Sequence, residues 1–348
     1  MRMGGGEDAM KAIVQEGYGS PDDVLHLREV DRPVPKDDEV LVRVRAASVH
    51  PDVWHMVRGR PYVLRIMGAG LSGPKSPIPG TDLAGRVESV GDAVTRFRPG
   101  EEVFGESVRG YQWDNGGAYA EYVTVHEESL ASKPATVSFE QAASVPTSAL
   151  IVLQNLRGPA KVRAGQRILI NGAAGGVGAF AVQLAKAEGA EVTGVDSTVK
   201  LDLLRSIGAD RVIDFTREDF TTEGQRYDLI LDIPGNHPFS EVRRALTPDG
   251  VYVLIGHNGY GASAGRWLGS LRRFLKLIVI SPFVKQLPPL DFSSPNKREA
   301  MAQVRELLEA GKVTPVVDRT FPLNEVPQAI EYLEGGRARG KIVITVAE

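Results

Sequence analysis

Residues 167–187 read RILINGAAGGVGAFAVQLAKA, and this stretch decides the fold of the chain around it. An apolar strand runs directly into a glycine-rich turn, and the turn opens a long apolar helix. This order favours dinucleotide binding, because the first N–H groups of the helix and its dipole can hold a pyrophosphate. The alternative is a tight turn without a ligand. We rank it lower, because a complete strand–turn–helix–strand unit surrounds the turn.

Two glycines of this turn have separate expected roles. Gly175 would let the backbone approach a pyrophosphate, and Gly178 would let the helix pack closely on the strand. Ala173 stands where the G-x-G-x-x-G pattern has its first glycine, so the turn departs from that pattern.

The end of the next predicted strand carries conflicting signals about the dinucleotide. Asp196 lies where an acid accepts the ribose 2′-hydroxyl of NAD. Ser197 and Lys200 follow at once, and both could bind a 2′-phosphate. Taken singly, Ser197 could instead cap a helix and Lys200 could be solvated.

Strands and helices alternate over residues 136–290, which predicts a doubly wound parallel sheet. The predicted helices are 138–156, 177–190, 200–208 and 239–250, and the predicted strands are 167–172, 191–197, 211–215, 227–233 and 251–256. Ser138 and Gln141 form the sequence pattern of a capping box at the start of the first helix.

The residues before 136 predict a different kind of module. Short β-like runs alternate with Pro and Gly turns, which is typical of an all-β domain, here a partly open barrel. The runs after a helix at 298–313 resemble this module, so we expect the chain to return to it. The predicted domains are therefore 1–135 with 291–348, and 136–290.

Composition excludes several classes of protein. The 348 residues hold 41 Lys and Arg against 44 Asp and Glu, so no basic excess exists for nucleic-acid binding. The absence of cysteine excludes disulfides, zinc-thiolate sites, iron–sulfur clusters and a cysteine nucleophile. The first residues lack the apolar region of a signal peptide, and no apolar run is long enough to span a bilayer. We therefore expect a cytoplasmic location.

Four segments together carry a family resemblance. GTDLAGRVESVGDAVTRFRPGEEVFG (80–105), GGAYAEYV (116–123), NGAAGGVGAFAVQLAK (171–186) and RARGKIVI (337–344) resemble the zinc-independent medium-chain dehydrogenase/reductases. Within that superfamily the chain most resembles the quinone oxidoreductases, including the zeta-crystallin and reticulon-interacting groups. The resemblance implies a GroES-like barrel packed on a Rossmann domain, with NADPH in the cleft between them.

The resemblance also implies roles for individual residues. Ala174, Gly176, Val177 and Gly178, with Gly175, would meet the pyrophosphate. Ser197 and Lys200 would meet the 2′-phosphate, and Phe215 would border the adenosine. Gly256 would lie near the nicotinamide, and Arg339 and Gly340 would approach the cofactor from the C-terminal segment. Branch members commonly lack an acid at position 196, so Asp196 leaves NADH open as the less favoured cofactor.

The zinc-dependent relatives in this superfamily hold zinc with two cysteines and a histidine. By motif, those positions correspond here to His50, Thr81 and Pro146. One imidazole with a hydroxyl and a proline cannot make the three-ligand open site that activates an alcohol, so we expect no zinc. Hydride must then end on a carbon that accepts it directly, as in a quinone or an enone.

Candidate proton donors are fewer than candidate cofactor contacts. His50 stands where the family usually has Asn, and it could hydrogen-bond the nicotinamide ribose or the substrate oxygen. A satisfied histidine in the cleft wall explains it about as well. Tyr62 is the second candidate donor, although a loop tyrosine more often packs. We expect Asp82 to be structural.

Two segments have open interpretations. Residues 60–77 form a Gly- and Pro-containing loop that could be a substrate lid or a surface insertion, and we favour the lid. Residues 266–285 combine basic residues with apolar ones, which would suit a membrane surface or a quinone tail. We favour a helix and an edge strand whose apolar face is covered in a homodimer, over membrane contact.

Together these features predict an NADPH-dependent, zinc-free oxidoreductase that reduces a quinone or another α,β-unsaturated carbonyl. One alternative is a zinc-free alcohol dehydrogenase or aldehyde reductase. A second is an NADPH-binding structural or regulatory protein without turnover, because no indispensable catalytic side chain can be named.

Overall fold

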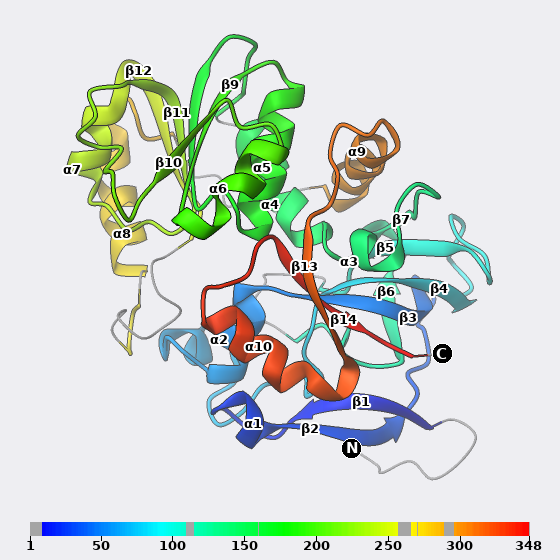
Figure 1. The fold of residues 1–348 in the computed structure, drawn as a ribbon. Coiled ribbons are helices and arrows are strands. Elements are labelled where there is room, and N and C mark those ends of the chain that lie inside the picture. Colours follow the sequence, from blue (N-terminus) through cyan, green and yellow to red (C-terminus); the bar gives the residue numbers. More distant parts are fainter. Residues whose placement is uncertain are drawn as a thin grey trace. The chain divides into compact units, whose positions relative to one another are not determined.

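The chain divides into two compact units in the computed structural model, which describes residues 9–108, 115–158, 160–256, 266–269, 271–288 and 296–347 (Figure 1). The first unit comprises residues 1–147, 296–310 and 315–348. The second comprises residues 148–295 and 311–314.

The second unit is built on a five-stranded parallel sheet. Its order is β10-β9-β8-β11-β12, and every neighbouring pair is parallel. The strands are β8 (Arg167–Asn171), β9 (Glu191–Asp196), β10 (Arg211–Asp214), β11 (Tyr227–Asp232) and β12 (Leu246–Leu254). The chain runs from β8 outward to β10 and then starts again at β11, so the predicted doubly wound sheet is confirmed.

Helices accompany these strands, and buried apolar residues fill the space between the layers. The helices are α5 (Gly176–Ala187), α6 (Leu201–Ser206), α7 (Phe239–Val242) and α8 (Leu271–Ile280). Short 3₁₀ turns cover Thr198–Lys200, Arg243–Ala245 and Ser281–Phe283. Leu169, Ile230 and Tyr252 lie in one buried cluster with Leu277 of α8, so α8 is anchored beside β12.

Two predictions for this unit were wrong in detail. The helix expected over 239–250 ends early, because Leu246 is buried as the first residue of β12 and pairs with Tyr227. Pro248 also lacks the N–H that a continuing helix needs. After α8 the described residues form no edge strand, although the carbonyl of Gln286 accepts the N–H of Tyr252 at 2.8 Å.

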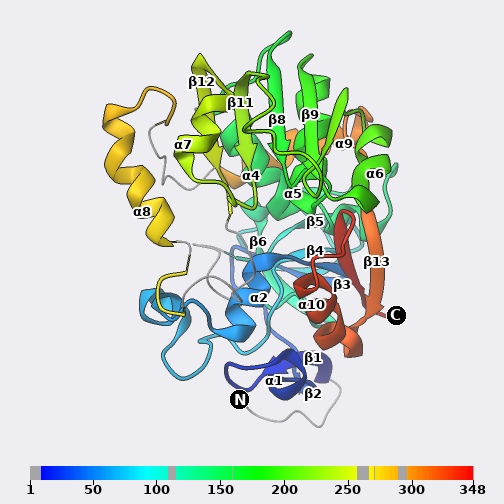
Figure 2. The same ribbon diagram turned by 60° about the vertical axis from the view of Figure 1, so that its left-hand side comes forward.

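The first unit contains a larger, mainly antiparallel sheet. Its order is β13-β14-β3-β4-β5-β7, with β6 paired to β3. The strands are β3 (Glu39–Val49), β4 (Asp82–Val90), β5 (Glu102–Glu106), β6 (Tyr122–His126), β7 (Leu130–Ser132), β13 (Val317–Pro322) and β14 (Lys341–Thr345). A separate ribbon joins β1 (Ala9–Gln15) to β2 (Leu25–Asp31). Because β14 pairs with β3, the C-terminal strands return to the first sheet (Figure 2).

Short helices surround this sheet. They are α1 (Pro21–Val24), α2 (Pro51–Arg58), α3 (Phe139–Ala143), α9 (Lys297–Glu309) and α10 (Val326–Glu334), with a π-helix at Arg65–Ala69 and 3₁₀ turns at Glu127–Ser129 and Leu323–Glu325. Among the described helices, none has the length and apolar character needed to cross a membrane.

The single helix expected over 138–156 is two helices. Ser138 and Gln141 form the predicted capping box at the start of α3, with contacts of 3.2 and 3.0 Å. This helix ends at Ala143, and a second helix, α4 (Pro146–Leu156), begins at Pro146. Because α3 packs on β3 and β4, it belongs to the first unit, although the sequence placed it in the second domain.

Candidate functional site

The glycine-rich turn of the second unit leaves β8 and enters α5. A Cβ built on Gly178 would lie 2.2 Å from the carbonyl oxygen of Gly172, so this glycine is required by close packing of helix on turn. A Cβ on Gly175 would meet that oxygen at 3.5 Å, an ordinary contact. The protein's own packing therefore does not require glycine at 175, and the first N–H groups of α5 beside it have no partner within the helix.

Asp196, at the end of β9, closes this turn. The side chain is buried and accepts the N–H of Ala174 at 3.0 Å and that of Ser197 at 2.8 Å. Both carboxylate oxygens therefore already hold backbone donors. Ala174 is fully buried, and its N–H is directed to Asp196.

Lys200 lies beside the same carboxylate. Its ammonium group is 3.8 Å from Asp196 and largely shielded from solvent. Ser197 precedes the 3₁₀ turn Thr198–Lys200 without capping it through its side chain. Phe215 follows β10 with half of its surface exposed, and its N–H donates to the carbonyl of Asp196 at 3.2 Å. The structure thus gathers three of the residues predicted for the adenosine end around Asp196.

A second carboxylate at this edge, Asp214, escaped the sequence analysis. Hydrogen bonds from Thr198 at 2.5 Å and Thr216 at 2.7 Å hold the pKa of Asp214 below its usual range. Asp214 is the last residue of β10 and therefore joins the loops that follow β9 and β10. Its position at a strand end is the signal that would have found it.

The change of direction in the sheet lies between β8 and β11, and buried polar groups mark it. Asn171 donates to Asp232 and to Asn236, each at 2.9 Å. Tyr252 donates its hydroxyl to the other oxygen of Asp232 at 2.8 Å, and its pKa is raised by burial next to that carboxylate. Ligands of doubly wound sheets bind at the carboxyl ends of strands beside such a point.

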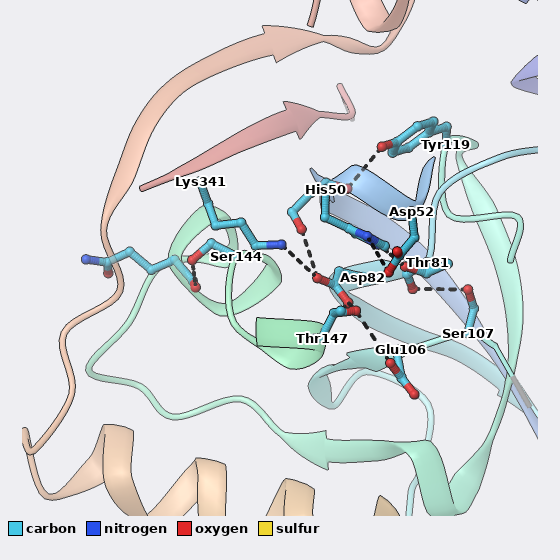
Figure 3. Close-up of polar contacts among 12 residues, drawn as sticks. His50, Asp52, Thr81, Asp82, Glu106, Ser107, Tyr119, Ser144, Thr147 and Lys341 are labelled. Carbon is cyan, nitrogen blue, oxygen red and sulfur yellow. Dashed lines mark hydrogen bonds and ion pairs between the residues drawn. The ribbon is translucent and has the colours of Figure 1, made fainter. Parts of the chain in front are cut away.

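His50 is buried in the first unit, where β3 passes into α2. Its Nε2 lies 2.6 Å from the Thr81 hydroxyl, and its Nδ1 lies 3.4 Å from the Asp52 carboxylate (Figure 3). The sequence predicted His50 as a candidate donor without naming these neighbours as its partners. The arrangement gives the imidazole a hydroxyl on one side and a negative charge on the other.

Asp82 lies next to this pair at the start of β4 and is fully buried. It accepts the Thr147 hydroxyl at 2.6 Å (Figure 3). It also accepts the Ser48 hydroxyl at 3.0 Å. The ammonium group of Lys341, itself buried, lies 3.3 Å from the same carboxylate. The hydrogen bonds and the opposite charge compensate the desolvation of Asp82.

A second buried ion pair adjoins the first. Glu106, at the end of β5, lies 2.5 Å from the Lys297 ammonium, and the Thr147 hydroxyl is 3.5 Å away. Burial raises the pKa of Glu106, although Lys297 opposes this shift. The sequence analysis missed Glu106, Lys297 and Lys341, because their partners are remote in the chain.

Tyr62, the other candidate donor, occupies a different environment. The Arg65 guanidinium stacks over the Tyr62 ring at 4.8 Å and over the Tyr18 ring at 4.3 Å. Arg65 also donates to the carbonyl of Gly59 at 2.8 Å. These contacts tie the start of the 60–77 loop to its neighbours.

The remaining predicted cofactor residues lie in both units. In the second unit, Gly256 follows β12, and a Cβ there would lie 2.6 Å from the carbonyl oxygen of Ile233. Arg339 and Gly340 belong to the first unit. Arg339 is exposed, and Gly340 has a φ of 93°, which suits glycine.

Comparison with known proteins places these units in a family. Residues 36–135 match the alcohol dehydrogenase GroES-like domain, and residues 207–344 match a family described as zinc-binding dehydrogenase. A quinone-oxidoreductase homolog of Spinacia oleracea is 32% identical over 96% of this chain and 98% of its own length. The chain belongs to the quinone oxidoreductases of the medium-chain dehydrogenase/reductase superfamily.

Two further relatives of this quinone oxidoreductase family member bear on its chemistry. The NADPH-dependent alkenal/one oxidoreductase of Arabidopsis thaliana is 32% identical over 96% of the chain and 79% of its own length. The solved quinone oxidoreductase of Escherichia coli complexed with NADPH is 25% identical, covers 96% of this chain and 99% of its own, and superposes with a TM-score of 0.77. The GroES-like and Rossmann folds predicted from the sequence are therefore confirmed.

The residues at the zinc-ligand positions of this medium-chain reductase differ from what the zinc-binding description of one matched family implies. At the three motif positions, His50 offers one nitrogen that already contacts Thr81, and Pro146 offers no side-chain donor. Within the described residues, no group of three His, Asp or Glu side chains is arranged to hold a metal ion. The donor set at these positions does not fit catalytic zinc.

Proposed function

We propose that this protein is an NADPH-dependent, zinc-independent reductase of quinones or other α,β-unsaturated carbonyls. The observation that carries the proposal is that one chain has both a dinucleotide-type glycine turn and, at two of the zinc-ligand positions of its relatives, His50 and Thr81. The names of the spinach and Arabidopsis relatives support the same reaction class.

The glycine turn is proposed to hold the pyrophosphate. Gly176, Val177 and Gly178 begin α5, and their N–H groups lie at the positive end of the helix dipole. Gly175 precedes them, and its missing side chain keeps the approach open. Ala174 supports the turn by donating its N–H to Asp196.

The contacts of Asp196 favour NADPH over NADH. Since both of its oxygens accept backbone N–H groups, the carboxylate is engaged in closing the turn. Lys200 and Ser197 lie beside it and offer a charge and a hydroxyl to a 2′-phosphate. Phe215 is proposed to cover the adenine, because its ring is exposed next to them.

The other end of the cofactor is assigned by the same proposal. Gly256 is proposed to lie near the nicotinamide, and Arg339 and Gly340 are proposed as further cofactor contacts. When bound, NADPH supplies a hydride to the electrophilic carbon of the acceptor.

The protein's own part in the chemistry is to manage charge and protons. Reduction of a quinone or enone leaves negative charge on an oxygen, which hydrogen-bond donors stabilise. We assign this donation to His50, whose Nε2 would exchange its contact with the Thr81 hydroxyl for the substrate oxygen, while Asp52, 3.4 Å from Nδ1, stabilises positive charge on the imidazole. Tyr62 or solvent would supply the proton if His50 does not.

Three further assignments stay predictions. We predict a homodimer, a cytoplasmic location and no nucleic-acid partner. Sedimentation velocity of the purified chain tests the first of these directly.

A paired fluorescence titration with NADPH and NADH, followed by addition of 1,4-benzoquinone or 9,10-phenanthrenequinone, tests the function. We expect tighter binding of NADPH, a loss of that preference in Lys200→Ala, and oxidation of bound NADPH when quinone is added. Lys161→Ala removes an exposed charge elsewhere in the same unit and serves as the matched control.

The other outcomes point to the rivals. Preference for NADH would contradict the assignment of Lys200 and return Asp196 to the ribose. Binding without oxidation across quinones and enones would contradict the reaction class. Alcohol-dependent reduction of NADP that survives a chelator would identify a zinc-free alcohol dehydrogenase instead.

A further inference from the structure

Helix α8 exposes apolar side chains that the Rossmann unit does not cover. Leu275 and Val279, one helical turn apart, are 53% and 69% exposed. Phe283, in the turn that follows, is 87% exposed, and Trp267, ahead of the helix, is 69% exposed. Four large apolar residues within so short a segment exceed the scattered exposure that is normal for a surface.

Basic residues share this exposed side. Arg272 and Lys276 are exposed and lie one turn apart, in a row beside Leu275 and Val279. Residues 266–285 contain five Lys and Arg and no Asp or Glu. In the described part of the chain, Arg266, Arg272 and Lys276 have no acidic partner, whereas Lys285 pairs with Asp249 at 2.5 Å.

The opposite side of α8 is fixed to the unit. Leu277 is buried in the cluster that contains Tyr252 of β12, and Ile280 packs against the same cluster. Arg273 turns inward and donates to the carbonyl of Gly235. The helix is therefore held by one side and presents a mixed apolar and basic side outward.

A second copy of the chain is a poor occupant of this face. In a two-fold interface both copies use the same patch, so two surfaces that each carry the unpaired Arg272 and Lys276 would face each other. Like charges brought together oppose association. An acidic partner removes this repulsion, and the neighbouring Leu275, Val279 and Phe283 require that partner to accept apolar side chains as well.

We propose that residues 266–269 and 271–285 form a membrane-docking surface that places the Rossmann unit on an anionic lipid bilayer. An interfacial helix of this kind inserts its apolar residues to the level of the headgroups, while Lys and Arg contact anionic lipid. The structural exposure of α8 thus favours the bilayer over the second copy that the sequence analysis preferred for this face, so the predicted homodimer would form through another surface. If the proposed function holds, docking would bring the enzyme to quinones dissolved in lipid.

Vesicle co-sedimentation of the full chain tests this surface without any turnover. We expect binding to vesicles of phosphatidylcholine with phosphatidylglycerol that is about tenfold or more tighter than binding to phosphatidylcholine alone, and weakened by added salt. Arg272→Ala with Lys276→Ala should abolish the preference for anionic vesicles. Val279→Asp with Phe283→Ser should reduce binding to both vesicle types. All four side chains lie outside the core.

Matched controls distinguish binding through this surface from general effects of charge or hydrophobicity. Lys161→Ala with Arg163→Ala removes two exposed charges from the same unit, and Val34→Asp changes an apolar residue that is 85% exposed in the first unit. Both should bind vesicles as the wild type does. NADPH titration and reduction of 1,4-benzoquinone in solution should be unchanged in every variant, so failure of docking is distinguishable from failure of the proposed function.

Three results would overturn the proposal. The first is no sedimentation of the wild type with anionic vesicles. The second is equal loss of binding in the Lys161/Arg163 control. The third is a lower mass in sedimentation velocity for the Val279/Phe283 variant with vesicle binding retained, which would assign the face to a second copy.

Discussion

Single residues in the first unit show how buried charge is arranged around the candidate proton donor. Asp82 is fully buried and is held by Ser48, Thr147 and Lys341. Removal of its charge would leave the Lys341 ammonium without a counter-ion in a dry environment. Such a loss costs about 3–5 kcal/mol of unfolding free energy.

Asp82→Asn should therefore lower the free energy of unfolding in urea by about 3–5 kcal/mol. It should also disturb β4 next to His50. Asp82→Asn combined with Lys341→Met removes both charges and should recover part of the loss. A single variant as stable as the wild type would contradict the assigned ion pair.

His55 provides a pH-dependent contribution to stability. Burial lowers the pKa of His55 from its ordinary value, against the carbonyl of Arg60 and the charge of Asp52, which raise it. Between the folded pKa and 6.5 the unfolded state binds more protons than the folded state. Stability is therefore fully present above 6.5 and declines as the pH falls through this window.

His55→Gln retains a side-chain N–H for Arg60 but has no charge to gain. Its urea midpoint should fall less between pH 7 and pH 5 than that of the wild type, even though its stability at pH 7 is lower. Parallel pH dependences for the two proteins would show that His55 does not contribute.

The sequence predicted the roles of some residues in these clusters but not of others. Asp82 was predicted as structural because it sits in a recognisable phrase, GTDLAG. Its partner Lys341 lies 259 residues away, so no local pattern links the two. The same holds for Lys297 and Glu106, since pairings of charged residues across the fold depend on packing.

At the scale of elements, the β8–α5 turn separates packing glycines from ligand glycines. Gly178→Ala would drive a methyl group to 2.2 Å from the Gly172 carbonyl, so it should cost about 1–3 kcal/mol or more in stability. Gly175 has a φ of −79°, which alanine adopts without strain, and its Cβ would meet an ordinary contact.

Gly175→Ala should therefore keep its unfolding free energy within about 1 kcal/mol of the wild type, while its NADPH affinity falls about tenfold or more. Urea unfolding and fluorescence titration of both alanine variants check the pair. Unchanged NADPH affinity in Gly175→Ala would contradict the proposed approach of the pyrophosphate.

Local signals in the sequence also set the limits of element prediction. The capping box of Ser138 and Gln141 was found because its partners are three residues apart. The early end of α7 was missed, because the burial of Leu246 as a strand residue depends on its pairing with Tyr227. The sequence showed that residues 266–285 combine basic and apolar residues, but the exposed side of α8 became known only from its packing.

At the scale of the whole molecule, the order of the modules could be predicted from the sequence, whereas the geometry of the candidate site could not. The alternation of strands and helices between 136 and 290 predicted the parallel sheet that is observed. The discontinuous first unit was suggested by β-like runs after 313, and β14 does pair with β3. Asp52 is a local neighbour of His50, but Thr81 comes from a separate segment 31 residues away, so the environment of His50 required the fold.

Metal independence is a prediction for the whole chain and can be tested on it. With no cysteine in 348 residues and His50 contacting Thr81, the motif positions lack a zinc donor set. Dialysis against EDTA and 1,10-phenanthroline should therefore leave the thermal midpoint, NADPH affinity and quinone reduction unchanged. Metal analysis of the purified protein should find zinc well below one equivalent per chain. A loss of activity that added zinc restores would instead require ligands that the sequence analysis and the described residues do not reveal, and the direct hydride acceptor proposed here would have to be reconsidered.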